Sequence, residues 1–302
     1  MKKLFFILAF LALGASGTAA QQVMTIKMDG SGGGRVDVFG LDDNTKMKKM
    51  DDAYLECIYN ARYVRDTLEP ETEGSAKEDV LKLMIGPKAS KFYSQKTFLA
   101  DSTVRAEMTP GRSIDLTNGS KYERGETYIL YKDREKGELM YTDQISLDHF
   151  IYNEKLEPQQ WEILDQTKEI LGYECQKAVC DFRGRRYEAW FTWELPISEG
   201  PWKFEGLPGL IMAVADDRGH YSFEIAGITR VENVPINYAD AKYHKTKRKD
   251  FLKTKLKYDT DPLGYLQNNS GAQITITNVD GTPISGSELN FMKYDFMERD
   301  YK

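Results

Sequence analysis

Apolar and polar residues alternate along much of this chain with a period of two. In residues 185–195, Tyr187, Phe191 and Trp193 share one parity while the other parity is mostly charged, and residues 220–228 repeat the alternation. Such a period is typical of a strand with one buried face and one exposed face. Residues 207–215 are apolar on both parities, which predicts a strand covered on both sides.

Further segments of this kind follow at intervals of roughly ten residues, with turn signals such as Leu171-Gly172 and Arg183-Gly184 between them. We predict strands at residues 55–64, 80–85, 91–95, 127–132, 138–143, 161–168 and 173–182. Short turns join antiparallel neighbours, whereas parallel strands need long crossovers. The sequence therefore predicts an all-β fold with minor α: a long curved antiparallel meander sheet, half-barrel-like, with a few covering helices.

The chain is expected to divide into four segments. Residues 1–20 combine two lysines, an apolar run and small residues at the end, which is the pattern of a secretory signal peptide. Residues 21–50 form a flexible Gly-rich segment whose glycines lack the spacing of a nucleotide-binding loop. Residues 51–235 hold the antiparallel β domain, and residues 236–302 form a basic helix and C-terminal extension packed on the same domain.

Composition narrows the class of protein. The 302 residues include 41 Lys or Arg and 47 Asp or Glu, a net charge of -6, which argues against a nucleic-acid partner. No segment approaches the roughly 20 apolar residues that a membrane-spanning helix needs. We therefore expect an exported protein, in the periplasm, associated with the outer membrane, or secreted.

The sequence contains few residues and motifs that indicate a metal site or a catalytic site. Three cysteines and three histidines disfavour a zinc site, and we predict no metal and no cofactor. Cys57, Cys175 and Cys180 are interpreted as at most one disulfide or as three buried thiols. The motifs of serine hydrolases, zinc proteases and P-loop proteins are all missing from the sequence, so we expect no enzyme activity and assign no catalytic residue. We leave open a catalytic pair of carboxylates assembled from distant strands.

One segment contrasts with the acidic remainder. Residues 242–257 carry eight Lys or Arg residues and one acid, and Phe251, Leu252 and Leu256 fall at helical spacing. The segment is interpreted either as a solvated helix face or as a surface for anionic lipid headgroups or an acidic partner. The candidate contact residues are Lys247, Arg248, Lys249 and Lys253.

A six-residue motif carries a family resemblance. It consists of Gly206, Leu207, Pro208, Gly209, Leu210 and Ile211. Through this motif, and through residues 90–94, 172–178, 182–185, 190–192 and 196–202, the chain resembles the GLPGLI (Porph_ging) family of exported Bacteroidetes proteins. The resemblance implies export, residence in the cell envelope and no established activity. The two glycines around Pro208 also predict a bend before a strand.

The one-sided aromatic strands lead to a first function hypothesis. We expect a non-enzymatic envelope protein that binds or carries an apolar or amphipathic, lipid-like ligand on a concave face, in an architecture that resembles the lipoprotein-carrier folds. The candidate ligand-facing residues are Tyr187, Phe191, Trp193, Trp202, Phe204, Tyr221 and Phe223. The same side chains would also serve as an ordinary core. The alternatives are an interaction module of an outer-membrane transporter or surface complex, with an outer-membrane protein as partner, and a secreted hydrolase.

Overall fold

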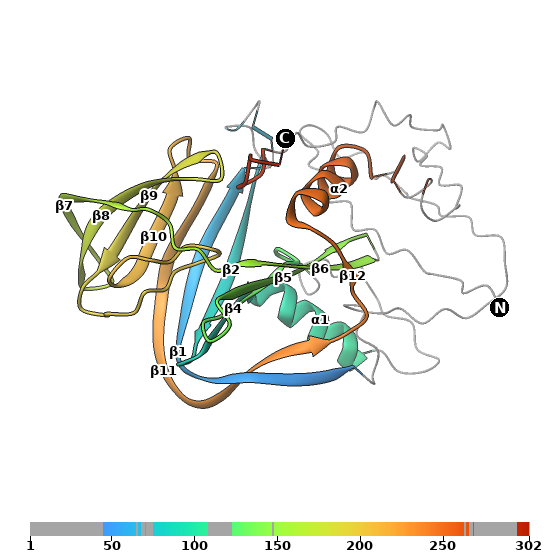
Figure 1. Cartoon of the computed structure of the whole chain (residues 1–302), viewed down its shortest axis with the longest axis horizontal. Helices are drawn as coiled ribbons and strands as arrows, with labels where there is room; N and C mark the ends of the chain where they lie inside the picture. The colour runs from blue at the N-terminus through green and yellow to red at the C-terminus, as the bar shows by residue number, and fades with distance from the viewer. Residues whose placement is uncertain are drawn as a thin grey trace.

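One curved sheet forms the body of the protein (Figure 1). The structure is a computed structural model that describes residues 45–64, 66–67, 70, 75–107, 123–146, 148–262, 264–265, 268 and 295–301. Within these residues, twelve strands are hydrogen-bonded in the order β12-β6-β5-β4-β3-β2-β1-β11-β10-β9-β8-β7. The strands are β1 (Lys46–Val64), β2 (Ala76–Ile85), β3 (Ala89–Ser94), β4 (Ile129–Asp133), β5 (Glu138–Ile145), β6 (Asp148–Lys155), β7 (Glu162–Ile170), β8 (Tyr173–Phe182), β9 (Arg185–Thr192), β10 (Leu210–Asp216), β11 (Tyr221–Asp240) and β12 (His244–Lys245).

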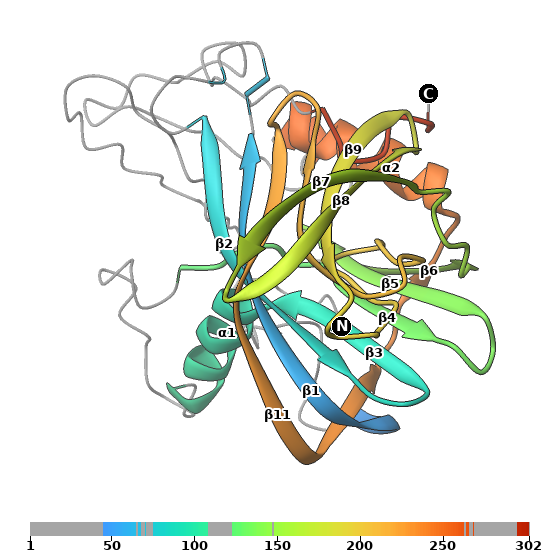
Figure 2. The same cartoon turned by 90° about the vertical axis from the view of Figure 1, so that its left-hand side faces the viewer.

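The sheet confirms the predicted fold class. All neighbouring strands are antiparallel except β12 and β6, which run parallel. The two longest strands, β1 and β11, pair along most of their length with three register shifts. Such irregularities bend a strand and increase its twist. The sheet consequently curls around a concave side, as Figure 2 shows.

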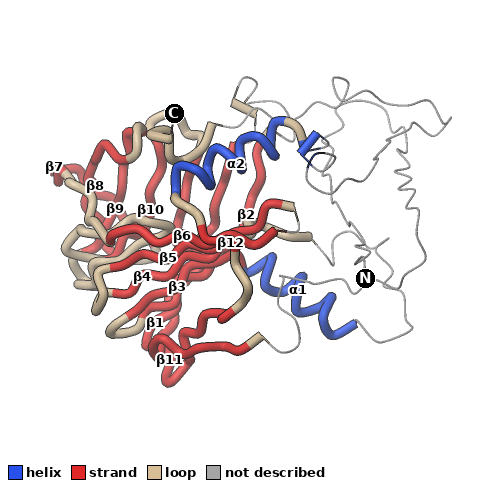
Figure 3. Tube along the Cα trace, turned by 45° about the vertical axis from the view of Figure 1, so that its right-hand side comes forward, coloured by secondary structure: helices blue, strands red, loops and turns tan. Residues whose placement is uncertain are grey.

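The main core lies on that concave side. Alternate residues of β2, such as Leu81 and Leu83, point into it and are fully buried. The buried hydroxyl of Tyr59 donates to the carbonyl of Ile211 at 2.7 Å, which ties β1 to β10. Helix α2 (Arg248–Thr260) covers β6 from this side and buries Phe251 in the core (Figure 3).

Helix α1 (Gln95–Glu107) packs next to β2 and β3. Its Phe98 contacts Tyr93 of β3 edge-to-face, with ring centroids 5.7 Å apart. Tyr93 belongs to a second, smaller apolar cluster around Met84 and Ile236, separate from the concave core. The two helices therefore attach to different apolar clusters of the sheet.

Several boundaries differ from the predictions. Strand β6 and helix α1 were not predicted, and β11 runs to Asp240 instead of ending near residue 228. Most residues in the far half of β11 are exposed or half-buried, and the few buried ones do not alternate regularly, so it lacks the pattern that marks a half-buried strand. The helix expected within residues 242–257 is α2, which begins at Arg248.

The segment predictions lie partly outside the described residues. The signal peptide at residues 1–20 and most of residues 21–50 fall there, although residues 46–50 are part of β1. Among the residues that are described, no helix is long and apolar enough to cross a membrane.

Candidate functional site

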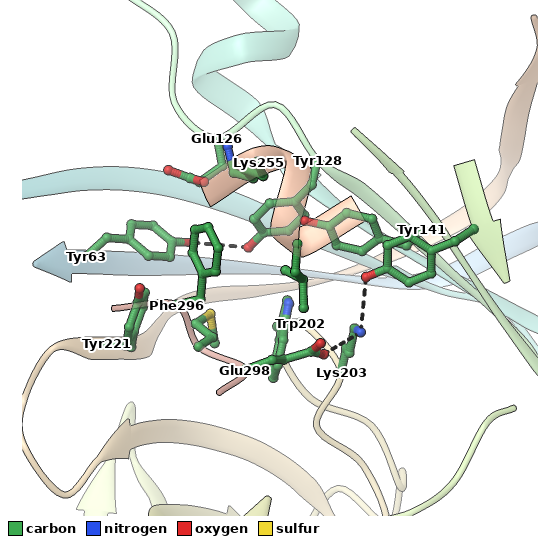
Figure 4. Close-up of a pocket in the computed structure, with 13 residues that line it drawn as sticks. Tyr63, Glu126, Tyr128, Tyr141, Trp202, Lys203, Tyr221, Lys255, Phe296 and Glu298 are labelled. Atoms are coloured by element: carbon green, nitrogen blue, oxygen red, sulfur yellow. Dashed lines mark hydrogen bonds and ion pairs between the residues drawn. The ribbon is translucent and has the colours of Figure 1, made fainter. Parts of the chain in front are cut away.

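An aromatic pocket lies on the concave side, bounded by the sheet, by α2 and by residues 296–298 (Figure 4). Its volume is about 70 Å³, enough for several water molecules or a small polar group, since one water needs about 10–15 Å³ on this measure. We call it the tyrosine pocket. It is lined by Tyr63, Glu126, Tyr128, Tyr141, Tyr152, Trp202, Lys203, Tyr221, Leu252, Lys255, Phe296, Met297 and Glu298.

Neighbouring strands bring the tyrosine rings together. Tyr141 of β5 lies opposite Tyr152 of β6 in the ladder, and their rings stack with centroids 4.7 Å apart. Tyr128, immediately before β4, stacks on the other face of this row at 5.6 Å from Tyr141, and its hydroxyl lies 3.1 Å from that of Tyr63. Burial raises the pKa of all four tyrosines well above the usual value. Their hydroxyls therefore stay protonated at neutral pH. Tyr63 and Tyr128 share one hydrogen bond and Tyr141 donates to Asp143, whereas the hydroxyl of Tyr152 accepts from Lys203 and keeps its own hydrogen for donation.

A buried group of charges forms one wall of the pocket. The ammonium of Lys203 contacts Glu154, lies 2.5 Å from a carboxylate oxygen of Glu298 and donates to the hydroxyl of Tyr152 at 3.2 Å. The guanidinium of Arg248 donates to the other oxygen of Glu298 at 2.6 Å. We call Lys203, Arg248, Glu154 and Glu298 the interior charge network. Burial pushes the pKa of Glu298 up, but Lys203 and Arg248 outweigh it and hold this pKa below its usual value, so Glu298 is ionised at neutral pH.

Two more carboxyl groups lie at or near the pocket. Figure 4 shows Glu126 beside Lys255, away from Glu298 and Lys203. Asp143 lies behind Tyr141, whose hydroxyl donates to it at 3.3 Å, and Thr127 donates to its other oxygen at 2.5 Å. Burial raises the pKa of Asp143, although Lys255 opposes the shift. Glu298 is thus ionised, whereas Asp143 holds its proton more tightly than an exposed aspartate.

The loop between β9 and β10 positions Lys203. Trp202, which precedes it, is buried and has a φ of 53°, a left-handed conformation that is rare for a large side chain. Gly206 turns the chain again with a φ of 93°. At Gly209 a Cβ atom would lie 1.9 Å from the carbonyl oxygen of Thr192, so only glycine fits against β9. The motif of residues 206–211 is therefore a bend followed by the buried strand β10, as its glycines predicted.

The candidate ligand-facing residues fall into two groups. Trp193 is 56% exposed and donates through its indole nitrogen to Gln176 at 2.8 Å. The other six are at most 6% exposed, and of these only Trp202 and Tyr221 line the tyrosine pocket; they are Tyr187, Phe191, Trp202, Phe204, Tyr221 and Phe223. The aromatic face predicted from the sequence is thus largely core.

The basic candidates lie together. Lys247, Arg248, Lys249 and Lys253 line a second cavity of about 560 Å³, at the start of α2. The three cysteines are free and buried. In the described part of the chain no group of three or more His, Cys, Asp or Glu is placed to hold a metal ion.

Sequence reasoning missed Glu126, Tyr141, Tyr152, Lys203 and Glu298. They come from β5, β6, two loops and the C-terminal residues, and no local spacing connects them. The abundance of tyrosine, 18 residues, was the one signal that pointed towards such a pocket.

Two solved structures share a distant likeness with this chain. Both are crystal forms of PNGF-II, in space groups P21 and C2, at 14% sequence identity and TM-scores of 0.46 and 0.43. The aligned region covers 68% and 66% of this chain but 34% and 32% of those chains, so this chain spans about a third of their length. No curated protein matches the sequence.

A family model corrects the assignment made from the six-residue motif. The model that matches is that of the N-glycanase peptide, N-terminal domain, over residues 119–256, which include the motif. The GLPGLI assignment is therefore wrong. The motif reflects the backbone geometry of a glycine bend before a buried strand, and that geometry is compatible with more than one function.

The function hypotheses that rested on the GLPGLI assignment are also wrong. A non-enzymatic carrier, an interaction module and the expectation of no enzyme activity are all contradicted, because the matching family is named for an enzyme. The physical reason is that one-sided aromatic strands are needed by any sheet with a core, and missing local motifs do not exclude a site assembled from distant elements. Over residues 119–256 this chain is similar to the N-terminal domain of an N-glycanase.

Proposed function

We propose that the protein is an exported hydrolase that releases N-linked glycans, with the tyrosine pocket as its reaction site. The observation that carries the proposal is the overlap between the family match and the pocket. Residues 119–256 contain nine of the thirteen residues that line it. The matched segment therefore supplies β5, β6, the Lys203 loop and most of α2, which build much of the site.

The lining suits hydrolysis of the bond between a glycan and its asparagine. In this reaction the oxygen of a water molecule bonds to the amide carbon of the asparagine side chain. The bond from that carbon to nitrogen breaks, and the nitrogen, which stays attached to the glycan, leaves with a proton. Such a step needs a group that moves a proton and donors that stabilise the developing negative charge. Glu126 is a half-buried carboxyl group in the pocket wall, and the protonated hydroxyl of Tyr152, which accepts from Lys203, is the donor.

Each polar group has a distinct role in this proposal. Glu126 takes the proton from the attacking water and returns it to the departing nitrogen. Tyr152 orients the substrate through its hydroxyl, and its stacking on Tyr141 fixes the position of that hydroxyl. Glu298 is bound to two cations, so it fixes Lys203 in the wall instead of exchanging protons.

The size of the pocket limits what enters it. A volume of about 70 Å³ accepts the linkage and a water molecule but not a whole oligosaccharide. The rest of the glycan would lie outside, over the mouth of the pocket. Export agrees with this substrate class, because the N-terminal pattern is that of a signal peptide; release into the periplasm or the medium is part of the proposal.

The test is an assay of glycan release. Purified protein is incubated with a fluorescently labelled N-glycopeptide carrying a neutral glycan, and the products are separated by liquid chromatography and identified by mass. We expect release by the wild type, and a decrease in kcat of about 100-fold or more in Glu126→Gln, the range for loss of a general acid–base group. KM should change little.

The matched control is Glu123→Gln, three residues away. Glu123 is 58% exposed and pairs with Lys96 outside the pocket, so its loss should leave kcat unchanged. Absence of release by the wild type would refute the proposed activity. Equal activity of the wild type and Glu126→Gln would refute the site.

A further inference from the structure

The second cavity has a marked excess of positive charge. It lies where α2 begins and has a volume of about 560 Å³. Six cationic and three anionic residues line it, in a chain whose net charge is -6. We call it the basic cavity. The proposed hydrolytic reaction makes no direct use of its exposed lysines.

The cations of the basic cavity are of two kinds. Arg248 is bound to Asp300 through two contacts of 2.6 and 2.7 Å as well as to Glu298, and Arg183 is bound to Glu154 at 3.1 Å. Both guanidinium groups are therefore already paired with carboxylates of the protein. The other kind is a set of exposed lysines that form no ion pair with any described residue. They are Lys155 at the end of β6 and the three lysines at the start of α2, Lys247, Lys249 and Lys253.

The start of α2 adds to the positive potential at this cavity. No side chain caps the helix at Lys247. The positive end of the helix dipole therefore faces the same space as the three lysines, which favours an anionic group there.

The surroundings of the lysines argue against a membrane surface. A helix that binds lipid inserts an apolar face into the headgroup region. In α2 the apolar residues Phe251 and Leu252 are 1% and 8% exposed and pack in the core. Glu157 and Asp250 also lie in the wall of the basic cavity and would repel anionic headgroups. A ligand that presents one acid and several hydroxyl groups fits this mixture of charges better.

The basic cavity and the tyrosine pocket share the interior charge network. Glu154 lines the basic cavity and contacts Lys203, which lines the tyrosine pocket. Arg248 lines the basic cavity and binds Glu298, which lines the tyrosine pocket. The two cavities are therefore bordered by the same group of four charged residues.

We propose that the basic cavity binds an acidic sugar of the substrate glycan. The carboxylate of that sugar pairs with Lys247, Lys249 and Lys253, and its hydroxyl groups donate to Glu157 and Asp250. This inference rests on the proposed function in one respect: the class of ligand is a saccharide. It adds a substrate preference, for glycans that carry an acidic residue.

Calorimetric titration of the full-length protein tests the inference. The probes are sialyllactose, which carries a carboxylate, and lactose, which does not. The test variant replaces Lys247, Lys249 and Lys253 by Gln. The control variant replaces Lys242, Lys245 and Lys257 by Gln, which removes the same charge from exposed positions of the same basic segment outside the cavity.

We expect sialyllactose to bind the wild type and the control variant with similar affinity. Its affinity for the test variant should be lower by about tenfold or more, equivalent to about 1.4 kcal/mol. Lactose should bind all three proteins weakly. All six lysines are exposed, so both variants should fold, which circular dichroism checks.

Other results would overturn the inference. An equal loss of affinity in both variants indicates diffuse electrostatic attraction, and sulfate that competes as well as sialyllactose indicates an anion site without recognition of sugar. Binding to equimolar phosphatidylcholine–phosphatidylserine vesicles that depends on Lys247, Lys249 and Lys253 indicates a membrane surface. Glycan release that persists while sialyllactose binding is absent refutes the inference alone. Sialyllactose binding without any glycan release refutes the proposed activity alone.

Discussion

Removing the charge of Glu298 should destabilise the protein strongly at neutral pH. Glu298 is 3% exposed and lies at 2.5 Å from Lys203 and 2.6 Å from Arg248. In Glu298→Gln both cations lose a buried partner, and breaking a buried pair in this way costs about 3–5 kcal/mol. We expect a decrease in the free energy of unfolding of about 3 kcal/mol, the lower end of that range, because Lys203 keeps Glu154 and Arg248 keeps Asp300.

The effect should depend on pH in a defined direction. The pKa of Glu298 is lower in the folded protein than its usual value of 4.5, so its contribution to stability is present above that value and is lost as the pH falls through the folded-state pKa. The stability difference between wild type and Glu298→Gln should therefore shrink below about pH 4.5. Urea unfolding at a series of pH values measures it.

A matched variant distinguishes the effect of losing a buried charge from the effect of losing a partly exposed one. Asp300→Asn removes another carboxylate partner of Arg248, but Asp300 is 33% exposed. Partly exposed pairs contribute about 0–1 kcal/mol, so this variant should lose little stability. Equal losses in Glu298→Gln and Asp300→Asn, or a difference from wild type that is the same at neutral and acidic pH, would refute the reasoning.

Two further predictions concern the interior. Burial raises the pKa of Asp143 above its usual value of 3.8, so its contribution to stability is present below that pH and is lost as the pH rises. Asp143→Asn should therefore gain stability relative to wild type between acidic and neutral pH. Urea unfolding that shows the opposite trend would contradict this prediction. Gly209→Ala would place a Cβ atom 1.9 Å from the carbonyl oxygen of Thr192, and its free energy of unfolding should decrease by about 3 kcal/mol or more. In the control Gly227→Ala the added atom meets nothing within 4 Å. Its free energy of unfolding should change by about 0.5 kcal/mol or less in the same assay.

The fold was largely predictable because its strands are half-buried. Alternation over residues 185–195 and apolar residues on both parities of residues 207–215 predicted β9 and β10, and tight glycine turns predicted antiparallel order. The elements that the sequence did not predict have a common cause. Strand β6 and the far half of β11 are exposed or half-buried at most positions, and α1 has little amphipathic character. Without a buried face there is no period to detect.

The site was not predictable from spacing. Tyr63, Tyr141, Lys203 and Glu298 meet only because the sheet curls and because the loop before β10 and the C-terminal residues enter its concave side. An aromatic stripe such as that of Tyr187 in β9 does not distinguish a core from a binding face, since both need apolar residues at every second position. The basic segment was predicted as a solvated helix face or as a surface for lipid or an acidic partner, and four of its basic residues line the basic cavity, which its charge alone did not indicate.

The buried charges of the loop before β10 are hard to explain by stability alone. Glu199, Lys203 and Glu205 are at most 6% exposed, and all three lie in ion pairs. Withdrawing such groups from water costs several kcal/mol per ion, and apolar replacements of similar volume are often as stable or more so. A sheet with this many buried aromatic residues does not need ion pairs to close its core. Lys203, however, joins the tyrosine pocket to the basic cavity through Glu154 and Glu298. The buried charge of Lys203 is therefore better explained by the geometry of the two cavities than by the energetics of the fold.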